Sequence, residues 1–319
     1  LGAAVVTGDN NTAVGTNAGA AITSGAQNTA VGAQALDAST TGASNTAVGF
    51  QSLTTNILAD ASTAVGFRAL STHNVGSSAL TYNTAVGYDA GLSVTTGVKN
   101  TFMGGLAGDA TDDGAGNTAV GYLSLSANAG DQNTAVGDNS LGVVTGSNNT
   151  AIGRAAGLQI TSGGNNIAIG LDALRSGSPG GAQTTASNKI GLGDENISSA
   201  NIQVDWTVAS DARDKTDFTA LDLGLDFVKA LAPVTYKWDK RSKYGDKRAD
   251  GYDLNDQTPD GTHKEDWLDI GFKAQEVEAL EQAAGYNKSN KTNLISSHTD
   301  DGKQMGLQYS KFVPILVKA

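Results

Sequence analysis

The chain has 319 residues, no cysteine, and an excess of acidic over basic side chains that gives a formal net charge of −11. The acidic balance argues against a groove for nucleic acid or a surface for anionic membranes, and favours neutral binding partners. The absence of cysteine excludes disulfides and thiolate metal sites, so burial, hydrogen bonds and association of copies must stabilise the protein. We see no apolar run long enough to cross a bilayer and no leader peptide, and expect the chain, which lacks an initiator methionine at Leu1, to be a fragment.

A five-residue motif, Asn-Thr-Ala-Val-Gly, recurs from Asn11 onward. Identical copies start at Asn11, Asn28, Asn45, Asn83, Asn117 and Asn133. Variants start at Ser62, Asn100, Asn149, Asn166 and Asn188. Most successive copies lie 16 or 17 residues apart, a period typical of solenoids. The sequence therefore predicts a mostly β repeat solenoid or β-roll.

Each repeat is expected to contain one short strand, Thr-Ala-Val, with threonine and valine on one face and alanine on the other. A single unit cannot bury its apolar face, so stacked units must share a core, with glycines supplying positive φ at the corners. Asparagines one coil apart would be placed to form side-chain amide ladders. The tolerance of asparagine for turns is an equally good explanation of its position.

The repeats resemble the Asn-x-Ala-x-Gly head repeats of trimeric adhesins and the shafts of phage tail fibres, although their period is longer than the adhesin one. The resemblance covers roughly residues 1–195. It implies a homotrimer of β-rolls or interwound β-coils. The small alanine and valine side chains favour association as well, because several chains wound together bury more apolar surface than one thin coil.

Two features of the repeat array bear on its function, a cluster of aspartates and three longer repeats. Asp109, Asp112 and Asp113 cluster as the carboxylates of calcium sites do, but their spacing does not match the helix-loop-helix calcium motif. We expect a solvated loop there, with no metal ion and no cofactor. The stretches 57–61, 71–82 and 174–187 lengthen the period and are expected to project as loops, the surface best suited to a host receptor.

A different, highly charged composition begins at Ser210, after a connector over residues 196–209. Four apolar residues at helical spacing precede Pro233: Leu221, Leu225, Val228 and Leu231. They predict a helix, followed by a strand over 234–238 and, beyond a polar excursion, a strand over 270–272 and a helix from Ala274. The last apolar helix is cut short at Ala319, so we expect downstream residues to be missing. The pattern predicts a small α+β domain over residues 210–319.

Four motifs of this domain carry a second resemblance. They are Ser210-Asp-x-Arg-x-Lys215, Leu223-Gly-Leu-Asp-Phe227 with Pro233-Val-Thr-Tyr-Lys-Trp238, Gly271-Phe-x-Ala-Gln-Glu-Val277, and Tyr309-Ser-Lys-Phe-x-Pro-x-Leu-Val-Lys-Ala319. Together they are similar to the C-terminal intramolecular chaperone of phage tail fibres and endosialidase tailspikes. The resemblance implies trimerisation of a β-rich fibre, then self-cleavage just before the serine, at the Ala209–Ser210 bond. The truncated last helix departs from the family pattern.

The chemistry of Ser210 and Lys215 can be argued from the residues alone. Serine is a weak nucleophile that needs a base, and lysine serves as one where burial lowers its pKa from about 10.4. Five residues apart, the two side chains meet only if the chain turns between them. Asp211 and Asp214 should point away from Lys215, because they favour its charged form, while Arg213 would favour the neutral amine or bind a carboxylate. The alternative is a helix-capping serine beside a solvated lysine.

Other polar residues of the domain are weaker candidates. Gln275 and Glu276 are candidates for orienting the dyad or holding the oxyanion, although solvated positions on a helix surface explain them equally well. His263 and His298 lie in polar segments and are expected to be bystanders.

The sequence thus predicts a viral tail fibre that attaches to a host, forms a homotrimer, and carries a chaperone that releases itself in a single-turnover serine–lysine cleavage without an external substrate. The expected location is the virion, after assembly in the host cytoplasm. The expected partner is a host-surface glycan or protein, and neither nucleic acid nor membrane insertion is expected. The alternatives are a non-enzymatic trimeric bacterial surface adhesin, and a tailspike with a glycan-degrading domain upstream of this fragment.

Overall fold

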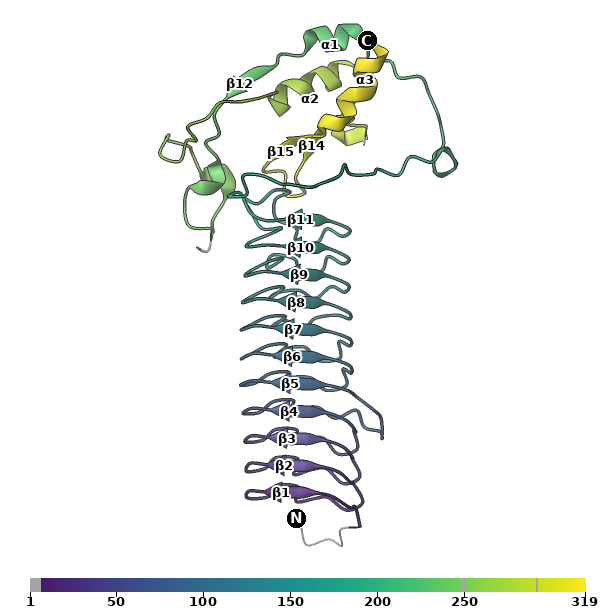
Figure 1. Cartoon of the computed structure of the whole chain (residues 1–319), viewed down its shortest axis with the longest axis vertical. Coiled ribbons are helices and arrows are strands. Elements are labelled where there is room, and N and C mark those ends of the chain that lie inside the picture. The colour runs from purple at the N-terminus through teal and green to yellow at the C-terminus, as the bar shows by residue number, and fades with distance from the viewer. Residues whose placement is uncertain (1–6, 248, 250, 291) are drawn as a thin grey trace. The chain divides into compact units, whose positions relative to one another are not determined.

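The computed structural model describes residues 7–319 apart from 248, 250 and 291. The chain forms two compact units that meet in sequence between Asp194 and Glu195. The first is a parallel β-solenoid, and the second is a small α+β unit that ends in a helix (Figure 1). The predicted fold class is therefore confirmed. No helix among the described residues is long and apolar enough to cross a bilayer.

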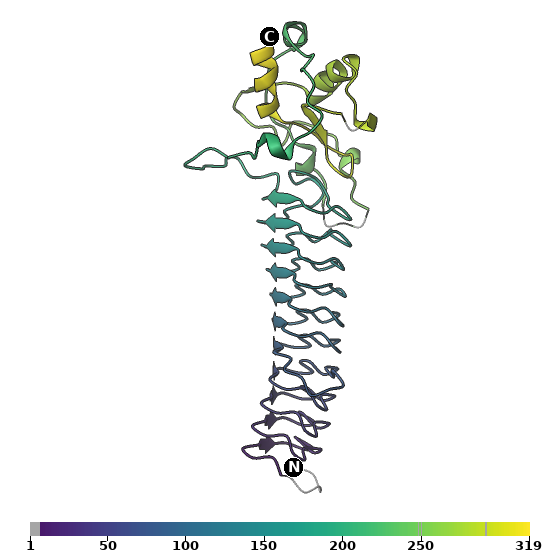
Figure 2. The ribbon, with the colours of Figure 1, turned by 90° about the vertical axis from the view of Figure 1, so that its right-hand side faces the viewer.

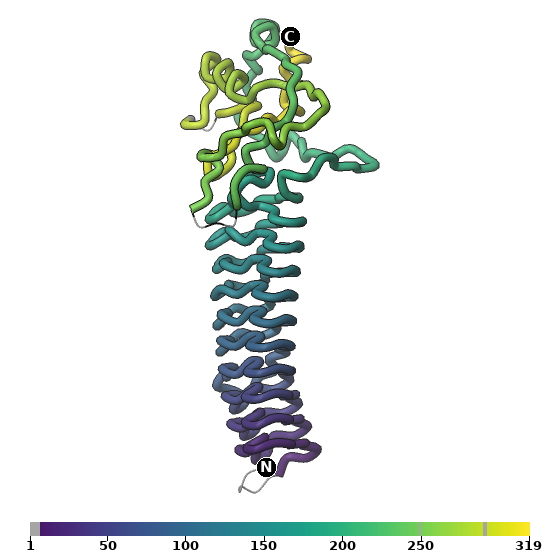
Figure 3. The backbone as a smooth tube through the Cα atoms, turned by 90° about the vertical axis from the view of Figure 1, so that its left-hand side faces the viewer, coloured from purple at the N-terminus to yellow at the C-terminus, as the bar shows by residue number. Residues whose placement is uncertain are grey.

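One strand of three residues per coil builds the solenoid, and the eleven strands form a single parallel sheet in sequence order (Figure 1). Figure 3 follows the same coils as a backbone tube, each stacked on the next. The strands are β1 Thr12–Val14, β2 Thr29–Val31, β3 Thr46–Val48, β4 Thr63–Val65, β5 Thr84–Val86, β6 Thr101–Met103, β7 Thr118–Val120, β8 Thr134–Val136, β9 Thr150–Ile152, β10 Ile167–Ile169 and β11 Ile190–Leu192. Equivalent residues of neighbouring coils pair in register. Each strand from β2 to β10 pairs with a strand of the same chain on both sides, so the sheet needs no interwound partner to complete its hydrogen bonds.

The solenoid core is made of the inward residue of each strand together with larger side chains from the turns. The central alanines, such as Ala30, are fully buried, and the flanking threonines and valines face outward, as the alternation predicts. The second apolar segment of each repeat forms turns that bury leucines such as Leu53 and Leu70. In β6, Phe102 takes the alanine position, and glycines at 91 and 108 leave room for its ring. The leucines supply the bulk that alanine alone lacks.

The motif asparagines are buried and hold successive coils together. The backbone N–H of Asn117 donates to Asn100 Oδ1 at 2.8 Å, and its amide Nδ2 donates to the carbonyl of Gly130 at 2.9 Å. Its own Oδ1 accepts from the N–H of Asn133 at 2.8 Å. Among the motif asparagines that the structure describes, amide-to-amide bonds join only the later coils, through Asn149 and Asn166. The predicted side-chain amide ladder is thus present only in the later coils, and elsewhere the asparagine side chains bond to the backbone of neighbouring coils.

Tight corners follow each strand. Gly121 has φ of +134°, and a β-carbon there would lie 2.6 Å from the carbonyl oxygen of Gly137, so only glycine fits. The next corner residues are not glycine: Gln51 and Leu53 have φ of 56° and 49°. Such left-handed residues cost roughly 1 kcal/mol each, and coil stacking must offset that cost. Glycines supply positive φ at the corners, as predicted, and residues other than glycine adopt it there as well.

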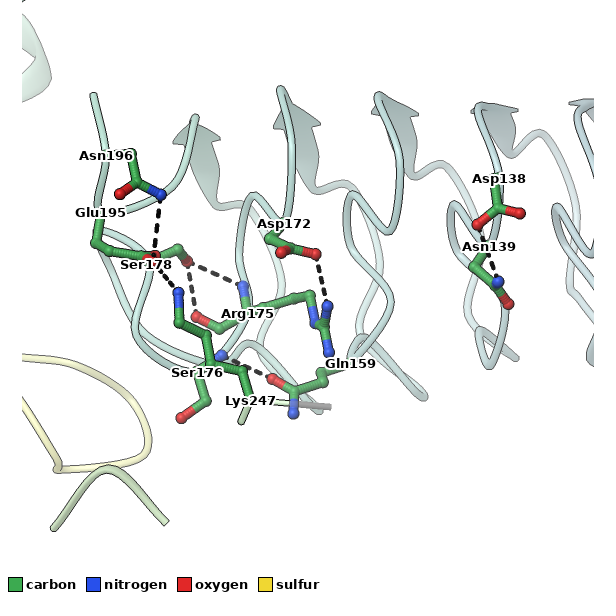
Figure 4. Close-up of polar contacts among 10 residues, drawn as sticks. All are labelled: Asp138, Asn139, Gln159, Asp172, Arg175, Ser176, Ser178, Glu195, Asn196 and Lys247. Atoms are coloured by element: carbon green, nitrogen blue, oxygen red, sulfur yellow. Dashed lines mark hydrogen bonds and ion pairs between the residues drawn. The ribbon is translucent and has the colours of Figure 1, made fainter. Parts of the chain in front are cut away.

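The lengthened coils are anchored more firmly than projecting loops would be. In the stretch 174–187, Arg175 pairs with Asp172 at 2.5 Å and its N–H donates to Ser178 Oγ at 2.9 Å (Figure 4). In the stretch 71–82, His73 is fully buried and lies beside Asn83, while residues 76–78 are exposed. These insertions are therefore partly anchored in the coils, and the expectation of projecting loops holds for their exposed parts, such as residues 76–78.

The second unit packs helices around a small core (Figure 2). Its elements are α1 Leu225–Ala230, β12 Val234–Tyr236, β13 Asp269–Gly271, α2 Ala274–Ala283, β14 Ser296–His298, β15 Met305–Leu307 and α3 Phe312–Lys318, with short 3-10 turns at Ala212–Asp214, Arg241–Lys243, Leu254–Asp256, Lys288–Asn290 and Tyr309–Lys311. Strands β12 and β13 pair antiparallel, as do β14 and β15. The predicted first helix and strand are present but shorter, because the helix starts only at Leu225 and the strand ends at Tyr236.

Candidate functional site

A tight turn follows Ser210. The carboxylate of Asp211 caps the 3-10 turn Ala212–Asp214 by accepting from the N–H of Arg213 at 2.9 Å. The turn closes when the N–H of Lys215 donates to the carbonyl of Ala212 at 3.3 Å. Aspartate is well suited to this place because its short side chain reaches the free N–H groups at the start of a turn.

The turn brings Ser210 and Lys215 together. Lys215 Nζ lies 2.6 Å from Ser210 Oγ and 3.3 Å from the carbonyl oxygen of Ser210. This is hydrogen-bond reach, the distance that proton transfer between a nucleophile and its base requires. Both residues are exposed in the single chain. The geometry of a serine–lysine pair is present, and the burial that would favour a neutral lysine is not supplied by this chain alone.

The charged side chains of Asp211 and Arg213 form an ion pair of their own, apart from the contact between Ser210 and Lys215. Arg213 Nη2 lies 2.6 Å from Asp211 Oδ2, and Arg213 Nε donates to both carboxylate oxygens at 3.1 Å. The side-chain bonds from Arg213 lower the pKa of Asp211, and its backbone N–H acts in the same direction. The same contact raises the pKa of Arg213. Because Arg213 binds Asp211, that carboxylate is partly neutralised before it acts on Lys215.

Gln275 and Glu276 lie elsewhere, in the first turn of α2. Both are exposed, and Glu276 Oε1 accepts from Lys273 Nζ at 2.7 Å. Within the described residues, no hydrogen bond joins either side chain to Ser210 or Lys215, and none ends on the carbonyl oxygen of Ala209.

Residues that sequence reasoning overlooked hold the domain in shape. Glu281 is fully buried, and its carboxylate accepts from the N–H groups of Leu294, Ile295 and Ser296 at 2.8, 2.5 and 3.0 Å. The sequence indicates this burial, because Glu281 follows Val277 by four residues and so lies on the apolar face of the same helix. His298, treated as a bystander, lies 2.7 Å from Glu278.

The acidic cluster of the solenoid binds hydroxyl groups of neighbouring coils. Ser126 donates to Asp109 at 2.6 Å, and Thr95 donates to Asp112. Across the described part of the chain, the structure contains no group of three or more histidine, cysteine, aspartate or glutamate side chains placed to hold a metal ion.

Comparison with known proteins identifies the second unit. Residues 210–286 match the protein family described as chaperone of endosialidase. No curated protein and no solved structure matches the chain. The matched segment begins at Ser210, the first residue of the turn described above.

Proposed function

Because residues 210–286 form a chaperone-of-endosialidase domain behind a β-solenoid, a combination typical of phage tail fibres and tailspikes, we propose that this chain is a trimeric viral tail fibre. The solenoid serves in attachment to the host, and the terminal domain aligns the copies and then cuts itself free at Ala209–Ser210. The observation that carries the proposal is the 2.6 Å contact of Lys215 Nζ with Ser210 Oγ at the first residue of the matched domain.

In the proposed cleavage, Ser210 attacks the peptide bond that precedes it, and the bond changes follow in a defined order. Neutral Lys215 takes the hydroxyl proton of Ser210, and Oγ attacks the carbonyl carbon of Ala209. The C–N bond to Ser210 breaks, the freed nitrogen receives the proton from lysine, and an ester links Ala209 to Oγ. Water then hydrolyses the ester, leaving a carboxylate on Ala209 and restoring the hydroxyl of Ser210. One cut ends the reaction, because the nucleophile is attached to its only substrate.

Exposure of the pair ties this reaction to assembly. A lysine amine in water is charged at neutral pH, and a charged amine has no lone pair with which to accept a proton. Burial against other copies would disfavour the charged amine and make it a proton acceptor. Cleavage therefore follows assembly, which prevents the chaperone from leaving before the copies are aligned.

Two uncharged surfaces support association of copies. The outward strand residues of the solenoid are all uncharged, and several apolar ones, such as Met103 and Leu192, are about half exposed. At about 4.8 Å per coil, this face extends about 50 Å. In the connector, every second residue from Ile202 to Val208 is apolar and more than half exposed, including Trp206 at 77%. Isolated monomers seldom leave such surfaces open, so contact with copies of the same chain explains them.

Intact mass spectrometry of the freshly folded chain tests the proposal, with the oligomeric state measured in parallel by light scattering. The wild type should give a trimer and two fragments, 1–209 and 210–319. Ser210→Ala and Lys215→Ala should give uncut trimers, and Lys237→Ala, which removes an exposed lysine of the same domain, should be cut normally. A wild-type trimer that stays intact, or a Ser210→Ala variant that is still cut, would show the cleavage proposal to be wrong and favour the plain adhesin.

A further inference from the structure

One corner of the solenoid carries a column of surface residues. Each of them directly follows the glycine that ends the five-residue motif of its coil. The column, here called the corner column, runs through Ala33, Phe50, Phe67, Tyr88, Gly105, Tyr122, Asp138, Arg154 and Leu171. Its four aromatic members are 39–56% exposed. Aromatic side chains make up only 6% of the chain. Their concentration at one repeat position of neighbouring coils therefore calls for a physical explanation.

Three of these rings stack. The centroids of Phe50 and Phe67 lie 5.4 Å apart, and those of Phe67 and Tyr88 lie 5.2 Å apart, with interplanar angles of 18° and 4°. Arg68 lies beside Phe67, with its guanidinium carbon 5.1 Å from the ring centroid, and binds Asp89 with two hydrogen bonds. Stacking covers the faces between the rings and leaves the outer face of Tyr88 without a neighbouring ring.

The next position of the corner column is Gly105, so one ring of the stack is missing before Tyr122. A β-carbon at Gly105 would meet only Tyr122 Cδ2, at 3.6 Å. At roughly 5 Å per coil, the backbone positions of Tyr88 and Tyr122 lie about 10 Å apart, which leaves room for one saturated six-membered ring between their side chains. We call this position the column gap.

We propose that the column gap binds one pyranose ring of a neutral polysaccharide on the host surface, held between Tyr88 and Tyr122. The faces of a pyranose present C–H groups, which pack on the electron-rich faces of aromatic rings, while its hydroxyl groups point outward to water. The corner column has no charged member from Ala33 to Tyr122, and Asp89 is occupied by Arg68, so an anionic sugar finds no free cation here. This inference rests on the host-attachment part of the proposed function.

A substitution that fills the column gap tests the site directly. The φ of Gly105 lies outside the left-handed region, and its β-carbon would meet only Tyr122 Cδ2 at an ordinary contact distance of 3.6 Å, so Gly105→Phe should complete the stack without straining the backbone. Ala33→Phe is the matched control, since it adds a ring at the other end, beside Phe50, and leaves the gap open. The probe is an array of neutral glucose, galactose, mannose and N-acetylglucosamine oligosaccharides, applied to the full-length fibre. Wild type and Ala33→Phe should bind the same glycans, and Gly105→Phe should bind them at least tenfold more weakly.

Each contrary outcome has a distinct meaning. Absence of binding by the wild type, or undiminished binding by Gly105→Phe, overturns the glycan site. If Gly105→Phe separates the copies while Ala33→Phe does not, the gap is an interface between chains and the proposal is wrong. Cleavage at Ala209–Ser210 does not depend on the gap, so a fibre that cuts itself and binds no neutral glycan refutes this inference alone.

Discussion

The asparagine ladder makes the sharpest prediction about stability. In Asn117→Ala, the N–H of Asn133 loses its acceptor, to which it donates at 2.8 Å. The carbonyl of Gly130 loses the donor at 2.9 Å but keeps a second one, Asn133 Nδ2, at 3.1 Å. Both asparagines are fully buried. One buried polar group is thus left unpaired, at a cost of about 1–3 kcal/mol, so the substitution should lower the free energy of unfolding by about that amount.

The matched control is Asn128→Ala. Asn128 Oδ1 also accepts from a backbone N–H one coil away, that of Asp112 at 3.0 Å, but the bond is exposed and water can replace it. Its loss should cost about 0.5 kcal/mol or less. The two variants thus remove similar hydrogen bonds and differ in burial.

Urea unfolding of the uncut full-length chain, followed by circular dichroism, measures the difference, and hydrogen exchange at the N–H of Asn133 locates it. Because each coil contacts only its neighbours, the loss of protection should be greatest in the coils on either side of Asn117. Equal effects of Asn117→Ala and Asn128→Ala, both below about 0.5 kcal/mol, would contradict the argument that buried rungs hold the coils together.

Two further predictions concern buried ionisable groups. Burial lowers the pKa of His73 to about 4, against an opposing contribution from its backbone contact with Thr95, so the unfolded chain takes up a proton first as pH falls. The stabilising effect of neutral His73 should be full above about pH 6.5 and fade towards pH 4, by at most about 3 kcal/mol. Urea unfolding across that range should show a weaker pH dependence of the unfolding free energy in His73→Gln than in the wild type. The same pH dependence in both proteins would contradict the lowered pKa of His73. Glu281→Gln places an amide donor where the carboxylate accepts from Leu294, Ile295 and Ser296. The substitution should therefore destabilise the second unit by about 1–3 kcal/mol. An unchanged melting transition of that unit, followed by tryptophan fluorescence, would contradict the stabilising role of the Glu281 carboxylate.

The repeat motif determined the architecture of the first unit because its constraints are local and recur. Threonine, alanine and valine alternate across a strand in any context, and a regular period allows each coil to pair with the next. Buried alanines such as Ala30 and Ala119, and buried asparagines such as Asn117, therefore stand where the motif placed them. The family resemblance of the second unit likewise depended on motifs that can be read along the chain.

Tertiary structure decided what depends on neighbours in space. Leu53 adopts a left-handed conformation that its own propensity opposes, because burial of its side chain between coils outweighs the local cost. Spacing alone required a turn between Ser210 and Lys215, whereas only the fold set their 2.6 Å contact and left it exposed. The corner column was equally hidden, because residues 17 and 21 positions apart become stacked rings only when the coils lie in register. Sequence determines the repeated local pattern, and register between coils determines which side chains meet.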